Sequence, residues 1–218
     1  MAYQPTGSIP ALSSWTWYNQ TGGAAGSTAV QNGSNNSGPI MVTLQDYTGL
    51  EWRVLSQPVP ASTPYKIQAL IRGMYPSTNK FIPENSQVAG LYFSDGTKIY
   101  GLETLSQTVS DTSGVTLRSH YGTTFSADTT DTNFTDIAVW SQAINAFVNA
   151  LWYQLRNDGT SLYVDFSVDG YNYINLGSVA ISSTLTPTVV GVGGISVQAG
   201  QNVFVNLMAW NVIGNATL

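Results

Sequence analysis

The sequence predicts an all-β protein built as a two-sheet antiparallel sandwich of the jelly-roll type. Short extended segments with alternating or continuous apolar residues recur along the chain, and turn signals such as Asp-Gly separate them. Only one segment has helical spacing. Strands at this density in a chain of 218 residues indicate one large β domain with a dry layer between two sheets.

The N-terminal part divides into a short arm and the start of the domain. Residues 1–14 are predicted to form an N-terminal arm that could serve for attachment, and residues 15–218 to form the jelly-roll domain. The Gly-, Ser- and Asn-rich stretch Asn19–Pro39 predicts either a loop with one poor strand or a linker. The loop is favoured, because Trp15 and Trp17 would otherwise lack a core.

Strands are expected at regular intervals after this loop. In Lys66–Arg72, the apolar residues alternate with Lys66, Gln68 and Arg72, so the polar side chains share one face. The expected strands are Ile40–Gln45, Glu51–Ser56, Lys66–Arg72, Val88–Phe93, Thr97–Leu102, Gly114–Tyr121, Trp152–Arg156, Leu162–Val168, Tyr173–Ser178, Val189–Gln198 and Asn202–Gly214.

Two segments between residues 136 and 178 carry more specific local signals. Trp152–Ser178 predicts a three-stranded meander, because the Asp158-Gly159 and Asp169-Gly170 pairs are hairpin signals in which Gly accepts a positive φ.

In Asp136–Tyr153, apolar residues recur at i, i+4, i+7, i+8 and i+11, which predicts a short helix or a crossover loop. The residues with this spacing are Trp140, Ile144, Phe147, Val148 and Leu151.

Composition excludes several function classes. The net charge is −5 and the seven basic residues are scattered, so nucleic-acid binding is not expected. The chain has no cysteine and no apolar run long enough for membrane insertion.

Only 9% of residues are charged, which predicts a hydroxyl- and amide-rich exterior. Because no secretory signal is visible, this exterior suggests a protein made in the host cytoplasm and carried on a virion surface, as bacteriophage proteins are. The alternative is an export signal that has been removed.

Three segments resemble the concanavalin A-like lectin/glucanase superfamily, a LamG-like jelly roll of two curved sheets. "PASTPYKIQALIRG" resembles its first strand, and "VAGLYFSDGTKIYGL" its buried strand and hairpin. "WYQLRNDGTSLYVDFSVDGYNYINLG" resembles its strand–turn–strand segment, which ends in Ser-x-Asp-Gly-x-x-Trp, with Tyr173 in the usual Trp position. The resemblance covers about residues 40–214 and implies the fold, but one sandwich hosts many functions.

The resemblance also provides a test for catalysis. Glucanases of this superfamily carry Glu-x-Asp-x-x-Glu on one strand, because retaining hydrolysis needs two carboxyl groups about 5–5.5 Å apart. The three glutamates Glu51, Glu84 and Glu103 are isolated in this sequence. We therefore predict no catalytic residues and no enzyme activity. A pair from separate strands, such as Asp165 with Glu103, is the remaining route to a glycoside hydrolase.

Carbohydrate binding needs aromatic faces against sugar C–H groups, with polar groups that hold the hydroxyls. The best candidates lie on polar strand faces or beside turns. They are Arg118, His120, Tyr121, Tyr163, Asp165 and Tyr171. For His120, the only histidine, the alternative is a strand-end residue without a binding role.

No cofactor and no metal site is assigned. Lectins of the superfamily bind calcium, and Asp128, Asp131 and Asp136 gather in one polar segment, which leaves calcium as a candidate. Their spacing matches no EF-hand loop, so a solvated polar loop is favoured.

Two functions are favoured over a glycoside hydrolase. The first is a non-enzymatic phage virion protein, a head decoration or a tail or fibre component, whose lectin-like domain binds host surface glycans. The second is an architectural capsid or tail cladding protein without a ligand. The expected partners are other virion proteins, copies of the same chain in a homo-oligomer, and host cell-surface polysaccharide.

Overall fold

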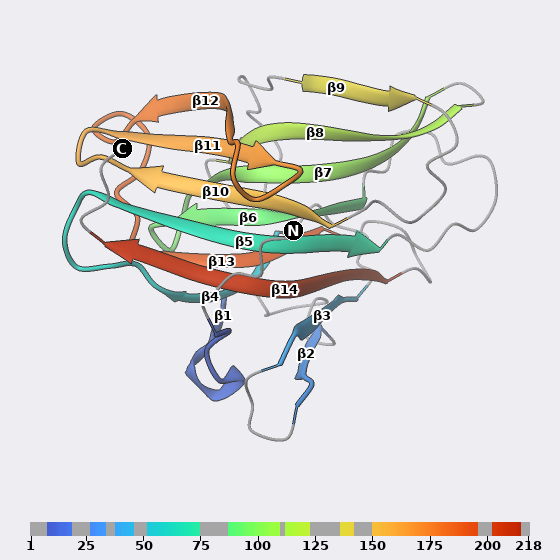
Figure 1. Ribbon diagram of the computed structural model, residues 1–218, viewed down its shortest axis with the longest axis horizontal. Helices are drawn as coiled ribbons and strands as arrows, with labels where there is room; N and C mark the ends of the chain where they lie inside the picture. Colours follow the sequence, from blue (N-terminus) through green and yellow to red (C-terminus); the bar gives the residue numbers. More distant parts are fainter. Residues whose placement is uncertain are drawn as a thin grey trace.

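The computed structural model describes residues 8–18, 27–33, 38–45, 52–74, 87–109, 112–122, 136–141, 150–195 and 202–214. Within these ranges the protein is an all-β sandwich of two antiparallel sheets, which confirms the predicted fold class (Figure 1). The one helical element there is a 3-10 turn, η1 (Leu12–Ser14). In this part of the chain no helix is long and apolar enough to cross a membrane.

Among the described residues, each sheet has seven strands. Sheet A has the order β1 (Thr16–Tyr18), β4 (Arg53–Pro58), β13 (Val189–Ile195), β6 (Gln87–Ser94), β7 (Ile99–Val109), β8 (Thr112–Gly122) and β9 (Asp136–Ser141). Sheet B has the order β12 (Ile174–Ala180), β11 (Ser161–Ser167), β10 (Leu151–Asn157), β5 (Tyr65–Met74), β14 (Val203–Gly214), β3 (Ile40–Leu44) and β2 (Thr28–Gln31). The predicted meander is therefore β10–β11–β12.

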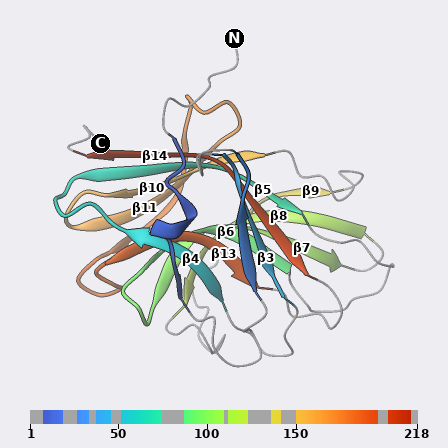
Figure 2. The same cartoon turned by 90° about the horizontal axis from the view of Figure 1, so that it is seen from below.

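The hydrophobic core fills the space between the two layers that Figure 2 shows. On β5, Ile67, Ala69 and Ile71 are buried, as the alternation predicted. A hydrogen bond of 3.2 Å from the Tyr153 hydroxyl on β10 to Thr104 Oγ1 on β7 connects the inner faces of the two sheets. Along β5, Lys66 and Gln68 alternate with the buried apolar residues and so lie on the outer face of sheet B.

The N-terminal segment packs on the sandwich. Ile9 belongs to the hydrophobic core, and the Trp15 ring contacts Trp210 edge-on, with 5.0 Å between ring centroids. Residues 8–14 of the predicted arm therefore lie against the domain, while residues 1–7 lie outside the described ranges. The loop interpretation of 19–39 holds where it can be followed, because its poor strand is β2.

Between residues 136 and 153 the sequence predicts a short helix or a crossover loop that leads into the strand at Trp152; the strand is confirmed as β10, but a helix at Asp136–Ser141 is wrong because these residues form β9. Trp140 lies in β9 and pairs with Val115 on β8, and Leu151 begins β10. Strand pairing overrides the helical spacing, which apolar residues in short segments can produce by chance. Residues Ile144, Phe147 and Val148 lie outside the described part.

Candidate functional site

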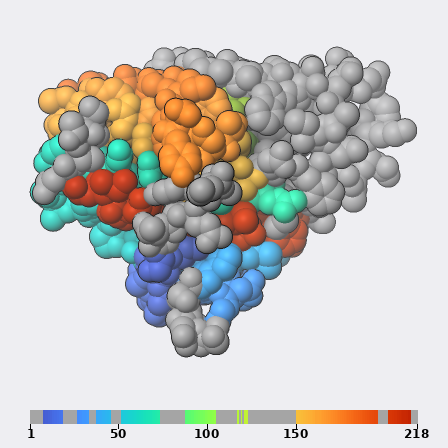
Figure 3. Space-filling view, viewed as in Figure 1, coloured from blue at the N-terminus to red at the C-terminus, as the bar shows by residue number. Residues whose placement is uncertain are grey.

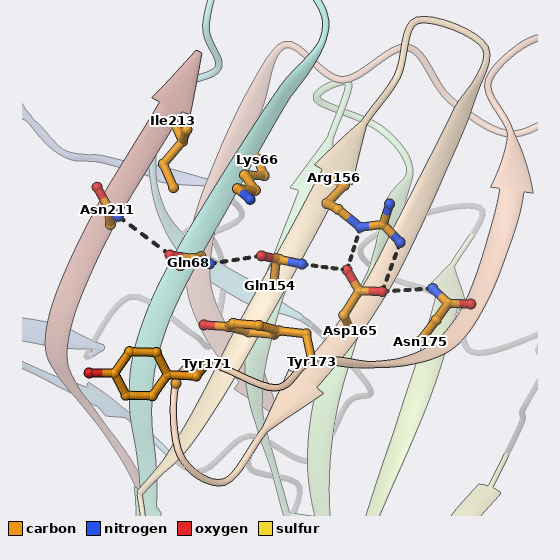
Figure 4. A pocket seen from close by; sticks show the side chains of 11 residues that line it. Lys66, Gln68, Gln154, Arg156, Asp165, Tyr171, Tyr173, Asn175, Asn211 and Ile213 are labelled. Carbon is orange, nitrogen blue, oxygen red and sulfur yellow. Dashed lines mark hydrogen bonds and ion pairs between the residues drawn. The ribbon is translucent and has the colours of Figure 1, made fainter. Parts of the chain in front are cut away.

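A row of polar side chains crosses the outer face of sheet B (Figure 4). Strand register brings one residue from each of five neighbouring strands into this row. The five residues, which we call the amide row, are Asn211 (β14), Gln68 (β5), Gln154 (β10), Asp165 (β11) and Asn175 (β12).

Three amides of the row donate hydrogen bonds in one direction. Asn211 Nδ2 donates to Gln68 Oε1 at 3.4 Å, and Gln68 Nε2 donates to Gln154 Oε1 at 2.8 Å. Gln154 Nε2 then donates to Asp165 Oδ2 at 2.8 Å. Because such chains of hydrogen bonds polarise one another, the carboxylate fixes the orientation of each amide.

Asp165 is held from its other sides as well. Arg156 donates from Nε to Oδ2 at 2.6 Å and from Nη2 to Oδ1 at 3.0 Å, and Asn175 Nδ2 donates to Oδ1 at 2.8 Å. Asp165 is only 2% exposed, so its charge needs these four hydrogen bonds. The hydrogen bond to Asp165 also raises the pKa of Arg156.

Two β-bulges place the ends of the amide row. The β14–β5 register shifts between Leu207 and Ala209, so Asn211 comes to face Gln68 on the outer side. The β11–β12 register shifts beside Asp165, so Asn175 pairs with Asp165 while Leu176 is buried in the core. Bulges re-aim side chains in this way and are common next to binding sites.

The connection between β11 and β12 folds over this face through the Ser-x-Asp-Gly pattern. Ser167 Oγ donates to Asp169 Oδ1 at 2.7 Å and accepts a bond from the Gly170 amide at 2.9 Å. Asp169 also accepts bonds from the backbone amides of Asn172 and Tyr171, which hold the pKa of its carboxyl well below the usual range.

Gly170 is required where the connection meets the sheet. Its φ is +79°, which favours glycine, and a Cβ there would lie 2.8 Å from Trp152 Nε1. Trp152 is therefore buried beneath the connection, on the outer side of β10.

A groove of about 570 Å³ lies between the connection and the amide row. Figure 3 shows the connection, in orange, standing out on this face of the molecule. In Figure 4, Tyr171 and Tyr173 extend across the strands, and the Tyr171 side chain is prominently exposed, at 59% for the residue. The lining residues are Lys66, Gln68, Gln154, Arg156, Asp165, Gly170, Tyr171, Tyr173, Asn175, Asn211 and Ile213.

The structure brings three of the predicted binding residues together. Asp165 and Tyr171 line the groove. Tyr163 stands beside it, with its ring under the Arg156 guanidinium at 4.4 Å and its hydroxyl donating to Asp158 Oδ2 at 2.9 Å. Tyr163 therefore positions Arg156 through a cation–π contact.

The other three predicted residues are in the opposite sheet. Arg118, His120 and Tyr121 all lie on β8 of sheet A, so they do not form one site with Asp165. Tyr121 packs against the hydrophobic core. The side chains of Arg118 and His120 lie outside the described part of the structure.

The carboxylate pair considered from the sequence is not formed. Glu103 is buried in sheet A, where it accepts hydrogen bonds from Trp52 Nε1 at 3.3 Å and from the Tyr92 hydroxyl at 2.6 Å. Asp165 belongs to the amide row of the other sheet.

The candidate calcium segment cannot be followed. Asp128 and Asp131 lie outside the described residues, and Asp136 begins β9. Where the structure is described, no three His, Asp or Glu side chains gather into a metal site.

Several groove residues were not identified from the sequence. The alternation of polar and apolar residues in Lys66–Arg72 places Lys66 and Gln68 on a polar face, and Tyr173 occupies the last position of the Ser-x-Asp-Gly-x-x-Trp pattern. These signals could have identified the three residues. No sequence signal marks Asn175 and Asn211, because the bulges that turn them outward are not visible in the pattern.

Comparison with known proteins shows the fold. No family model and no curated protein matches the sequence. The chain is similar to a functionally unknown protein from Saccharomyces cerevisiae, with a TM-score of 0.63, 12% identity, and coverage of 95% of this chain and 100% of that one. It is also similar to the VIP36 exoplasmic/lumenal domain in its Ca2+/Man-bound form, with a TM-score of 0.51, 12% identity, and coverage of 94% and 86%. Together with the strand order, these likenesses support the fold of a two-sheet antiparallel sandwich.

Proposed function

We propose that this chain is a lectin-like domain that binds carbohydrate, without cleaving it, in the groove on the outer face of sheet B. One observation carries the proposal: an oriented row of amides lies beneath two tyrosines, one of them largely exposed. A sugar ring has apolar C–H faces and a rim of hydroxyls, so it matches this combination.

The amides can still bind hydroxyl groups. Gln68 and Gln154 each use one of two N–H donors within the row, and each carbonyl oxygen has a second lone pair. Because each amide orientation is fixed, donors and acceptors alternate along the groove. Tyr171 and Tyr173 provide ring faces of negative electrostatic potential that favour C–H contacts.

Binding is favoured over hydrolysis because of how Asp165 is held. Retaining and inverting glycosidases need two carboxyl groups. Among the described residues that line the groove, Asp165 is the one carboxylate. Its oxygens already accept four hydrogen bonds, which suits an anchor better than a nucleophile.

The fold supports the same proposal. A VIP36 domain of similar fold is known in a Ca2+/Man-bound form, so a sandwich of this type accommodates a sugar ligand. This likeness does not specify the ligand of the present chain.

A glycan array tests the proposal. The unmodified chain is expected to bind a defined set of glycans, and Tyr171→Ala is expected to weaken that binding at least about tenfold by removing a stacking face. Val168→Ala is the control, because Val168 is exposed on the same connection but does not line the groove. Equal binding by the parent and Tyr171→Ala would contradict the placement of the site.

The proposal that this protein is located on a virion is based on the sequence alone, on its low content of charged residues and its N-terminal segment. We infer that the domain is displayed on a particle surface together with other virion proteins and copies of itself. Detection of the chain on purified particles, and its copy number there, test this. A copy number that matches the capsid lattice, without glycan binding, would favour the architectural alternative.

A further inference from the structure

The charge of the groove is opposite to that of the whole chain. The protein has a net charge of −5, yet the described groove lining contains two cations, Lys66 and Arg156, and one carboxylate, Asp165. Because Arg156 is paired with Asp165 at 2.6 Å, the remaining charge is that of Lys66. The lining therefore carries one uncompensated cation, Lys66, while Asp158 adds a second negative charge near Arg156 from outside the lining.

The two cations stand directly opposite each other. Lys66 on β5 pairs in register with Arg156 on β10, on the same face of sheet B. Like charges directly opposite on neighbouring strands are destabilising. Asp165 offsets the charge of Arg156, but no carboxylate of the described residues is in ion-pair contact with Lys66. An anion in the groove would relieve this repulsion.

Asp165 and Tyr163 hold Arg156, which lines the groove, in one orientation. Nε and Nη2 are bound to Asp165, and the guanidinium lies over the Tyr163 ring. Figure 4 shows the third nitrogen, Nη1, pointing away from the carboxylate. Since these contacts fix the guanidinium plane, little rotamer entropy is lost when Nη1 binds a ligand.

We propose that the groove selects a negatively charged sugar, whose carboxylate or sulfate oxygens bind Lys66 Nζ and Arg156 Nη1. This inference rests on the proposed function, and adds the chemical class of the ligand. The sugar ring lies against Tyr171 and Tyr173, and its hydroxyls meet Gln68 and Gln154. Charge-assisted hydrogen bonds of this kind are about twice as strong as neutral ones.

The test compares charged and neutral probes by isothermal titration calorimetry. The probes are oligosaccharides containing glucuronate, galacturonate or N-acetylneuraminate, sulfated galactose oligosaccharides, and neutral counterparts of the same linkages. At least one charged probe is expected to bind about tenfold tighter than its neutral counterpart, with a preference that falls between 50 mM and 500 mM salt. Whether the carboxylated or the sulfated probes respond identifies the anionic group.

Two lysine variants locate the charge effect. Lys66→Gln is expected to remove the preference for the charged probe. Lys98→Gln makes the same charge change away from the groove, where Lys98 Nζ donates to the Thr184 carbonyl oxygen at 2.8 Å, and is expected to leave the preference intact. Circular dichroism melts of both variants show whether they fold.

The outcomes separate the two proposals. Equal affinity for charged and neutral probes, with binding lost in Tyr171→Ala, would overturn the charge selection and leave carbohydrate binding in the groove standing. A charge preference unchanged in Lys66→Gln would overturn the assignment to Lys66. No binding of any probe to the unmodified chain would overturn both.

Discussion

Arg156 binds Asp165 through two parallel hydrogen bonds, Nε to Oδ2 at 2.6 Å and Nη2 to Oδ1 at 3.0 Å. This pair organises the face on which the candidate site lies. It compensates the charge of the buried carboxylate, and Asp165 in turn orients the amides of Gln154 and, through it, Gln68. The stability of the face and its binding chemistry therefore depend on the same contacts.

Loss of Arg156 should destabilise the protein strongly. Arg156→Met leaves the Asp165 carboxylate buried without its cation, so we expect the free energy of unfolding to fall by about 3 kcal/mol. Urea denaturation measures this. The double variant Arg156→Met/Asp165→Leu should lose less than the sum of the two single variants, because no buried charge remains. A loss below about 0.5 kcal/mol in Arg156→Met would show that the pair is solvated.

The amide row should be energetically coupled. In a double-mutant cycle with Gln68→Ala and Gln154→Ala, we expect an interaction free energy of about 0.5–1.5 kcal/mol, because the two amides share a bond of 2.8 Å in a chain that ends on a carboxylate. A control cycle pairs Gln57 with Gln154. Gln57 lies on β4 of sheet A, where its Nε2 donates to Ser14, so it makes no contact with the amide row. A coupling between Gln68 and Gln154 no larger than that between Gln57 and Gln154 would argue against a continuous row.

Two of the Asp-Gly turns, Asp95-Gly96 between β6 and β7 and Asp169-Gly170 between β11 and β12, provide a matched pair of glycine variants. Gly96→Ala places a Cβ at φ +94° with its nearest neighbouring atom at 3.8 Å. The free energy of unfolding should therefore fall by about 1 kcal/mol, because of the backbone conformation alone. Gly170→Ala adds contact of 2.8 Å with the Trp152 indole, so it should lose about 1–3 kcal/mol more and also weaken glycan binding. Equal losses in the two variants would contradict the close packing of the connection on Trp152.

Stability should fall at alkaline pH because of buried tyrosines. Burial raises the pKa of Tyr65, Tyr100 and Tyr153 above the usual value of about 10, and the charge of Asp165 adds to the effect at Tyr100. The folded state therefore holds these protons more tightly than the unfolded state. Their contribution to the free energy of unfolding is complete below pH 10 and is lost as the pH rises further. Urea unfolding between pH 8 and 11 measures this, and Tyr153→Phe should flatten the decline. A free energy of unfolding that stays constant up to pH 11 would contradict the burial.

Much of the fold could be predicted because local patterns decide it. The alternation on β5 and the Asp-Gly signals around β11 specify strands, faces and turns without knowledge of the rest of the chain. The same local patterns identified Asp165 and Tyr171 as groove candidates.

The remainder of the site depends on relations between distant segments. The sequence does not say which strands are neighbours, so Tyr121 on sheet A was grouped with Tyr163 on sheet B. It also does not show the register shifts that turn Asn175 and Asn211 outward. These shifts are set by packing, for example by burial of Leu176, and not by any local residue preference.

The central claim, that the groove on sheet B binds carbohydrate, is tested most directly by NMR. The side-chain amide resonances of Gln68, Gln154 and Asn211 can be followed while a glycan that binds on the array is titrated into the 15N-labelled chain, with Gln57 as the internal control. We predict saturable shifts of the three groove amides and none at Gln57. Saturable binding that leaves the three groove amides unshifted would contradict the claim.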